Sequence, residues 1–226
     1  MESPEPISDS SFHPPLRGFL HRPADPNGKA LILTHGAGSN CQAPILVALA
    51  EAFTGAGFTV LRCDLPFRQE RPFGPPHPGN AACDREGLKR TVEAMRERVS
   101  GQVFLGGHSY GGRQSSMLCA DERGLADGLL LLSYPLHSPR KPEQLRTQHF
   151  PRLRTPTLFV HGTRDPFATI AEIESALKLI PAKTLLLQVE NAGHDLGFKG
   201  KSKRETLPSE VLKAFHNLHI SEAPSP

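Results

Sequence analysis

One segment of the sequence holds a serine between closely spaced glycines, with the letters GHSYG at residues 107–111. An apolar run at residues 102–106 precedes it, and a helical pattern follows it. This is the G-x-S-x-G pattern, in which the serine occupies a sharp strand-to-helix turn that exposes its hydroxyl. Glycines two positions before and after the serine let the strand and the helix approach closely enough to form that turn. The pattern therefore predicts that Ser109 is a catalytic nucleophile.

A nucleophilic serine needs a histidine base and a carboxylate that orients the histidine. In this strand–turn–helix setting the three residues follow one another along the chain as serine, acid and histidine. Asp165 comes shortly after the apolar run 157–161, and His194 shortly after the run 184–189. Because both runs are typical of strands, both side chains are expected at the carboxyl edge of one sheet. We therefore predict a catalytic triad of Ser109, Asp165 and His194.

Asp165 has an alternative structural role, because it could cap the helix that follows it. Some hydrolases place the acid after an earlier strand, here residues 128–133, but the loop after that strand has no carboxylate before Glu143. Asp195 adjoins His194, and the side chains of adjacent loop residues seldom face each other. These comparisons favour Asp165 as the acid.

Acyl transfer through a serine also needs N–H groups that stabilise the charged oxygen of the tetrahedral intermediate. One donor is the residue after the nucleophile, here Tyr110, and the other comes from the loop after an early central strand. That loop has the sequence HGAGSN at residues 35–40, and its glycines let the backbone turn and present an N–H group. We therefore predict an oxyanion hole formed by the N–H groups of Ala37 and Tyr110.

Three arginines near these motifs are candidates for substrate binding. Arg113 falls in the first turn after the nucleophile, where a cation opposes the helix dipole. It is expected to hold a substrate anion or to pair with a carboxylate such as Asp64. Arg68 and Arg71 lie in the proline-rich segment Pro66–Pro78, predicted to be a long loop without helix at the border of the active site. They either bind substrate or remain solvated, and together the arginines would favour an anionic substrate.

Other titratable residues are expected to be structural. His35 and His161 each end an apolar run and are expected to form structural hydrogen bonds, while His108 is expected to pack beneath the turn. Asp64 is expected to hydrogen-bond the loop that follows it. The remaining histidines have no ligand spacing, so we expect no metal, and hydrolysis by water implies no cofactor.

Short apolar runs alternate with helical patterns along the chain. Near-continuous apolar runs are typical of parallel strands that are covered on both faces. The predicted strands are 29–34, 58–63, 102–106, 128–133, 157–161 and 184–189, with an antiparallel edge strand at 16–21. The predicted helices are 43–56, 84–99, 115–121, 169–179 and 208–218. This alternation predicts an α/β fold with one doubly wound, mostly parallel sheet.

The composition fits one globular domain. Of 226 residues, 38% are hydrophobic and 22% are charged, and the formal net charge of +3 is too small to indicate nucleic acid as the main partner. No apolar run approaches the roughly 20 residues of a membrane span, and the N-terminus lacks a secretion signal, so a cytoplasmic protein with reduced cysteines is expected. We expect a domain at residues 16–219 between disordered tails at 1–15 and 220–226.

The motifs HGAGSN, GGHSYGGRQ, HGTRDPF and NAGHDL resemble those of the α/β-hydrolase superfamily, in its small dienelactone-hydrolase-like branch. Together they are similar to a group that includes a testis-expressed protein and a subunit of a chromatin acetyltransferase complex. The resemblance covers roughly residues 19–218 and implies the α/β-hydrolase fold, the serine nucleophile and the hydrolase class. Dienelactone hydrolases carry a cysteine nucleophile where this chain has Ser109, so their reaction is not implied. The usual cap is reduced to residues 134–154, so a minimal lid or none is expected.

These observations predict a serine hydrolase of the carboxylesterase or thioesterase type, acting on small esters in a shallow cleft. Because so short a cap buries little of a long acyl chain, short acyl groups are expected to be preferred. The alternative is a hydrolase-fold binding or scaffold protein whose site is catalytically idle. The complete set of triad residue types favours the enzyme.

Overall fold

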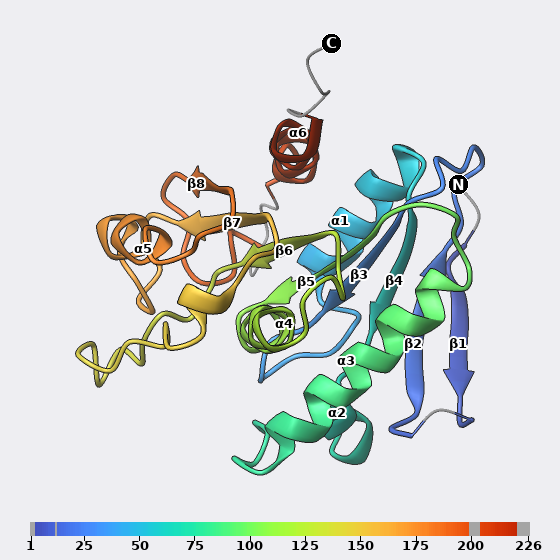
Figure 1. Ribbon diagram of the computed structural model, residues 1–226, viewed down its shortest axis with the longest axis horizontal. Coiled ribbons are helices and arrows are strands. Elements are labelled where there is room, and N and C mark those ends of the chain that lie inside the picture. Colours follow the sequence, from blue (N-terminus) through green and yellow to red (C-terminus); the bar gives the residue numbers. More distant parts are fainter. Residues whose placement is uncertain (1–2, 12, 199–203, 221–226) are drawn as a thin grey trace.

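The computed structural model describes residues 3–11, 13–198 and 204–220. Its centre is an eight-stranded sheet with the order β1-β2-β4-β3-β5-β6-β7-β8 (Figure 1). The antiparallel strands β1 and β2 form one edge, and the other strands run parallel. The strands are β1 (Glu5–Asp9), β2 (Leu16–His21), β3 (Ala30–Thr34), β4 (Thr59–Cys63), β5 (Val103–His108), β6 (Gly128–Leu132), β7 (Thr157–Gly162) and β8 (Thr184–Val189).

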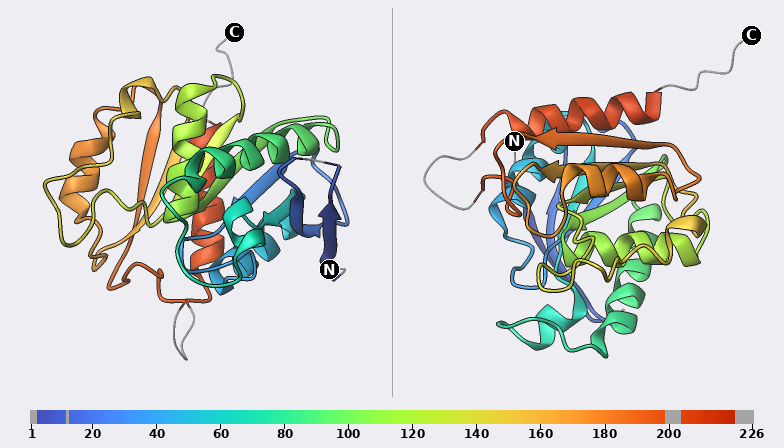
Figure 2. Two further views of the ribbon diagram at one scale, coloured as in Figure 1. Left: turned by 90° about the horizontal axis from the view of Figure 1, so that it is seen from below. Right: turned by 90° about the vertical axis from the view of Figure 1, so that its left-hand side faces the viewer.

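Helices cover both faces of this sheet (Figure 2). They are α1 (Pro44–Gly55), α2 (Pro66–Glu70), α3 (Asn80–Arg96), α4 (Tyr110–Asp121), α5 (Ile170–Leu177) and α6 (Leu207–Ile220), with a short 3₁₀ helix at Phe150–Arg152. Along β3, Leu31 and Leu33 face the core formed with α1 and α6, whereas Ile32 faces the core formed with α3, α4 and α5. Because both faces are buried, each central strand needs apolar residues at successive positions.

The predicted α/β fold with a doubly wound, mostly parallel sheet is confirmed. The six apolar runs form β3 to β8, each end lying within two residues of its predicted bound. The segment Leu16–His21 is antiparallel to β4 as expected, but it is not the edge strand, because β1 pairs along its other side. The helix expected at 115–121 begins earlier, at Tyr110, because the two glycines that follow belong to its first turn. Between β6 and β7 the described chain contains one 3₁₀ helix and no cap domain.

The proline-rich segment 66–78 differs from its expected loop, since it begins with the helix α2. Pro66 occupies the first position of this helix. A proline is tolerated there because the first N–H groups of a helix have no partner within it. The helix ends at Glu70, before the remaining prolines.

The expected N-terminal tail also needs correction, because residues 5–9 form β1. This strand pairs with β2 in a register that runs from Glu5 opposite Leu20 to Asp9 opposite Leu16. The pattern EPISD has little strand character of its own, so its order comes from the hydrogen bonds that β2 offers. Residues 221–226 of the expected C-terminal tail lie outside the described residues.

The four cysteines are unpaired, in agreement with the expected thiols. Cys83 is exposed on α3, whereas Cys41, Cys63 and Cys119 are buried. Burial raises the pKa of the Cys41 thiol and of the Cys119 thiol to about 12. These two thiols are therefore protonated across the physiological range.

His21, at the end of β2, is buried beside an arginine. Its Nε2 atom accepts a hydrogen bond of 2.8 Å from the Nε–H group of Arg62, which requires a neutral imidazole. Burial and the Arg62 charge lower the pKa of His21 from 6.5 to about 4. At a pH between these two pKa values, His21 is protonated in the unfolded chain but not in the folded chain. The free energy of unfolding therefore falls on acidification, by up to about 3 kcal/mol from this group.

We expect the substitution His21→Gln to reduce this acid sensitivity. The amide oxygen of the variant can still accept the Arg62 hydrogen bond, but the side chain no longer titrates. Urea unfolding of both proteins between about pH 7 and about pH 4.5 measures the effect. Equal losses of unfolding free energy in the two proteins would show that His21 is not a source of the acid sensitivity.

Candidate active site

Ser109 lies on a tight turn between the end of β5 and the start of α4. Its backbone angles are φ 50° and ψ −113°, a conformation that is strained for any residue with a side chain. A Cβ atom on Gly107 would lie 2.6 Å from the carbonyl oxygen of Thr34. One on Gly111 would lie 2.6 Å from the carbonyl oxygen of His35. The structure therefore has the sharp turn that the G-x-S-x-G pattern predicts, and both glycines are required sterically.

The turn brings Ser109 to the two other residues predicted for the triad. Ser109 Oγ lies 2.8 Å from His194 Nε2, and His194 Nδ1 lies 2.8 Å from Asp165 Oδ2. The Asp165 side chain is fully buried, whereas 24% of the His194 side chain is exposed. With Nδ1–H donating to the carboxylate, Nε2 accepts the serine hydroxyl proton. The second Asp165 oxygen accepts the N–H group of Phe167 at 2.9 Å, which fixes the carboxylate.

The alternatives to Asp165 are not supported by the geometry. Thr169 and Glu172 form a reciprocal capping box at the start of α5, so this helix does not need Asp165 as its cap. Asp195 directs one oxygen to the N–H group of Gly197, at 3.1 Å. In the segment after β6, no carboxylate reaches His194 among the described residues.

Two residues that line the site had no assigned function in the sequence. His108 is not packed beneath the turn as expected: its Nε2 lies 2.7 Å from the carbonyl oxygen of His194, and it borders the cavity in front of Ser109. Phe167 covers the His194 ring, with the ring centres 4.2 Å apart. The place of His108 directly before the nucleophile could have predicted that it lines the cavity, but no local sequence pattern predicts this for Phe167.

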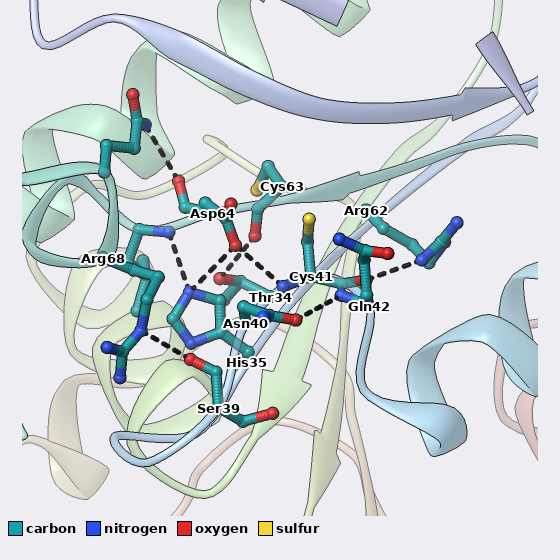
Figure 3. A network of polar contacts seen from close by, with 12 residues as sticks. Thr34, His35, Ser39, Asn40, Cys41, Gln42, Arg62, Cys63, Asp64 and Arg68 are labelled. Atoms are coloured by element: carbon teal, nitrogen blue, oxygen red, sulfur yellow. Dashed lines mark hydrogen bonds and ion pairs between the residues drawn. The ribbon is translucent and has the colours of Figure 1, made fainter. Parts of the chain in front are cut away.

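His35 and His161 are buried and hydrogen-bonded, as expected of structural histidines. His35 Nε2 accepts the N–H group of Leu65 at 3.1 Å, and burial lowers the pKa of this imidazole (Figure 3). His161 Nε2 lies 2.9 Å from the carbonyl oxygen of Ala168. Asp64 Oδ1 accepts the N–H group of Cys41 at 2.8 Å, so this carboxylate holds the loop after β3 rather than the loop that follows Asp64, which was the expectation (Figure 3).

The two predicted oxyanion donors belong to the loop after β3 and to the first turn of α4. Ala37 lines the cavity next to Ser109. Tyr110 is the first residue of α4, where N–H groups have no acceptor within the helix. The Tyr110 side chain does not enter the cavity lining, because its hydroxyl donates to Asp84 Oδ2 at 2.7 Å.

The cavity above Ser109 has a volume of about 340 Å³. It is lined by Gly36, Ala37, Gly38, Ser39, Ala43, Pro44, Ile45, His108, Ser109, Phe167, His194, Asp195 and Phe198. A larger hollow of about 660 Å³ lies beside it between α1 and the start of α6, sharing Pro44 and Phe198. The larger hollow has no nucleophile–histidine pair in its lining, so size alone does not identify the reactive site.

The structure does not bring Arg68 or Arg71 to the cavity lining. The Arg68 side chain is buried. It donates hydrogen bonds to main-chain carbonyl oxygens, including those of Ala37 and Ser39. Arg71 Nη1 lies 2.6 Å from His77 Nε2, outside the cavity. Neither residue belongs to the cavity lining, so this lining gives no support to the prediction that they bind substrate directly.

Arg113 is also absent from the cavity lining, and the described residues show no ion pair between Arg113 and Asp64. Its position is beside the connection between β6 and β7. There, burial and the Arg113 charge lower the pKa of His149 to about 4. The expected cluster of three cations around Ser109 is thus not formed.

Within the described residues, no three His, Cys, Asp or Glu side chains form a group that could hold a metal ion. None of the described helices combines the length and the apolar character needed to cross a bilayer.

A nucleophile turn after a central strand, with the acid and the histidine after later strands of one mostly parallel sheet, is the architecture of α/β hydrolases. The chain belongs to the α/β hydrolase domain family, whose model matches residues 27–219.

Three solved structures illustrate the fold. A dienelactone hydrolase from Anabaena variabilis is 20% identical and superposes with a TM-score of 0.74 over 96% of this chain and 99% of that one. A lidless α/β serine hydrolase from Xanthomonas campestris is 16% identical, with a TM-score of 0.70 over 100% of this chain and 98% of that one. An α/β serine hydrolase homologue from Coxiella burnetii is 16% identical, with a TM-score of 0.74 over 94% of this chain and 97% of that one. The expected membership of the α/β-hydrolase superfamily is thus confirmed by the family model, and the solved structures share the fold.

Proposed function

We propose that the protein is a serine hydrolase of the carboxylesterase or thioesterase type that acts through an acyl-enzyme on small esters. One observation carries this proposal: hydrogen bonds run without a break from Ser109 through His194 to the buried carboxylate of Asp165, beside a cavity. Membership of the α/β hydrolase family supports it.

In the proposed reaction Ser109 Oγ forms a bond to the substrate carbonyl carbon as its proton passes to His194 Nε2. The carbonyl electron pair moves onto oxygen. When the tetrahedral intermediate collapses, the bond to the alcohol or thiol breaks, and the leaving group takes the proton from His194. Water then attacks the acyl-enzyme by the same route, releasing the acid and restoring Ser109. Asp165 holds the His194 tautomer and stabilises the imidazolium.

The N–H groups of Ala37 and Tyr110 are the proposed donors to the oxyanion. Such donors accelerate reaction because they stabilise charge that develops only in the transition state. A single donor is worth roughly 3 kcal/mol in a well-studied protease.

The cavity favours a small neutral acyl or alkoxy group. Its volume of about 340 Å³ is near the lower end of the range for ligand sites, which is about 300–1,000 Å³. Ala43, Ile45 and Phe167 give the cavity apolar walls. The described lining contains one carboxylate, that of Asp195, and no lysine or arginine. Because no arginine belongs to this lining, we propose a neutral substrate instead of the anionic one expected from the sequence.

We expect kcat/KM for p-nitrophenyl acetate and butyrate to exceed that for the decanoate, by about tenfold, because a ten-carbon chain extends beyond the cavity and gains little burial. Initial rates across a series of graded chain lengths measure this. A kcat/KM that rises steadily with chain length would contradict it and would indicate that the chain continues past Pro44 and Phe198 into the larger hollow.

A fluorophosphonate probe tests the proposed function directly, because it reacts with an activated serine and needs no knowledge of the substrate. We expect stoichiometric labelling, with the modified peptide containing Ser109. A Ser39→Ala variant is the matched control, since Ser39 also lines the cavity, and it should still be labelled. No labelling at any pH would reject the enzyme and favour the idle binding or scaffold protein.

A further inference from the structure

Arg68 is a buried guanidinium group surrounded by main-chain carbonyl oxygens. The residue is 7% exposed. Its hydrogen bonds run from Nε to Ser39 (2.7 Å), from Nη2 to Ala37 (2.8 Å) and Gly74 (2.9 Å), and from Nη1 to Arg71 (2.9 Å). Figure 3 shows the side chain reaching from the segment after β4 to Ser39. One planar group therefore joins the loop after β3 to the proline-rich segment.

This burial has an energetic cost that calls for an explanation. A buried charge is unfavourable unless it is paired or fully hydrogen-bonded. Among the described residues no carboxylate lies within ion-pair distance of Arg68. Its hydrogen-bond partners are all carbonyl oxygens, and its guanidinium carbon lies 4.9 Å from the centre of the Phe67 ring. A guanidinium group suits this position because its donors form a rigid planar fork, whereas a lysine ammonium has a single donor atom. Ala37 and Ser39, which it holds, both line the catalytic cavity.

Asp84 makes a corresponding connection between α2 and the start of α4. Its side chain belongs to α3, and the residue is 0% exposed. Asp84 Oδ1 accepts the N–H group of Phe67 at 3.0 Å, and Oδ2 accepts the hydroxyl of Tyr110 at 2.7 Å. The Phe67 and Tyr110 rings also meet edge to face, with their centres 5.7 Å apart.

Phe67 and Arg68 are adjacent residues of α2, so this short helix is tied to both proposed oxyanion donors. Through Arg68 it holds the Ala37 loop, and through Asp84 it holds Tyr110. We propose that Arg68 and Asp84 are positioning residues for the oxyanion hole, with α2 as the shared support that sets the separation of the two N–H donors. This inference rests on the proposed function and names residues that do not touch the substrate.

Accurate spacing matters because each donor must lie about 2.7–3.1 Å from the position of the oxyanion. A displacement of about 1 Å in a catalytic group costs about 10²-fold in rate. The loop after β3 contains two glycines, Gly36 and Gly38, which do not restrict its backbone. Asp64 restrains this loop at Cys41, and Arg68 adds a second restraint at Ala37 and Ser39.

The test compares Arg68→Lys and Arg68→Ala with the native protein. We expect kcat for p-nitrophenyl acetate to fall about tenfold for Arg68→Lys and about a hundredfold for Arg68→Ala, with KM changed less than about threefold. Rates are divided by the concentration of reactive serine, titrated to completion with a fluorophosphonate, so that misfolded protein does not count. The inhibition constant of a trifluoromethyl ketone, whose adduct carries an oxyanion, should rise by the same factor as kcat falls.

Arg96→Lys is the matched control. Arg96 also donates to two main-chain carbonyl oxygens, those of Gly124 and Leu125, but it lies at the opposite edge of the sheet, where the strands begin. It should leave both kcat per reactive serine and the inhibition constant unchanged. If Arg68→Ala fails to fold, Arg68→Lys decides. Native kcat and native inhibition in that variant, or an equal loss in Arg96→Lys, would overturn the proposal.

Asp84→Asn tests the second connection. The amide oxygen can still accept the N–H group of Phe67, but the amide nitrogen then faces Tyr110, whose hydroxyl must accept instead of donate. This reverses the Tyr110 hydrogen bond and removes the carboxylate charge from it, and we expect kcat per reactive serine to fall about fivefold. Asp127→Asn is the control, because Asp127 accepts the N–H group of Val103 at the far edge of the sheet. An unchanged kcat in Asp84→Asn would remove Asp84 from the proposal. Absence of fluorophosphonate labelling in the native protein would instead reject the proposed function, which keeps the two failures distinct.

Discussion

Ser109→Ala should lower kcat for p-nitrophenyl acetate by about 10⁶-fold, leaving only the slow attack of water in the cavity. The reason is that the variant has no oxygen to form the acyl-enzyme, whereas His194 and Asp165 remain in place. The fold should be retained, because Ser109 Oγ contacts His194 and no core residue in the described hydrogen bonds. Initial rates with thermal unfolding of the same samples measure both expectations.

The matched variant is again Ser39→Ala, which removes the second serine hydroxyl of the cavity but keeps the carbonyl group that Arg68 holds. It should retain fluorophosphonate labelling, while Ser109→Ala should lose it completely. A Ser109→Ala protein with more than about 1% of native kcat would contradict the assignment, since a nucleophile deletion costs far more than that.

Asp165→Asn should lower kcat by up to about 10⁴-fold, through the tautomer of the base. In the native site His194 Nδ1–H donates to the carboxylate, and Nε2 accepts from Ser109. An amide nitrogen in the place of that oxygen donates to Nδ1 and forces the proton onto Nε2, which then cannot accept the serine proton. The remaining carbonyl oxygen can still accept the N–H group of Phe167, so the loop should keep its conformation.

Asp195→Asn is the control for this second prediction. It changes the neighbouring carboxylate, which also lines the cavity but directs an oxygen to Gly197. Its effect on kcat should be at least about a hundredfold smaller than that of Asp165→Asn. If Asp195→Asn were the more damaging variant, the acid would have been assigned to the wrong residue.

The sequence was sufficient for those parts of the molecule that depend on local patterns. Ser109 was predictable because the steric demands of its turn fall on residues two positions away, which the GHSYG pattern displays. The strands β3 to β8 were predictable because burial on both faces requires continuous apolar runs. Asp165 and His194 followed from their places after two such runs, without any knowledge of the contacts between them.

The features that sequence patterns missed depend on partners elsewhere in the chain. The segment EPISD is polar and contains a proline, and it becomes a strand only because β2 offers an unpaired edge. Arg68 has the sequence signature of a solvated loop cation. Its hydrogen-bond partners are main-chain carbonyl oxygens up to 31 residues away in the chain. Every residue has such a carbonyl group, so no sequence pattern identifies these partners. The cavity walls were missed for the same reason, since Ile45 belongs to the start of α1 and Phe167 to the loop after β7.

The distribution of the thiols gives the molecule a natural attachment point. Three cysteines are buried, and Cys83 stands exposed on α3 next to Asp84. A fluorophore maleimide should therefore attach at one position without any engineered substitution, at mildly alkaline pH because partial burial and nearby carboxylates raise the pKa of the Cys83 thiol. Such a dye would lie one residue from the carboxylate that joins Phe67 to Tyr110. Its emission would report changes in the contacts between Asp84, Phe67 and Tyr110 while substrate binds to the cavity and product leaves it.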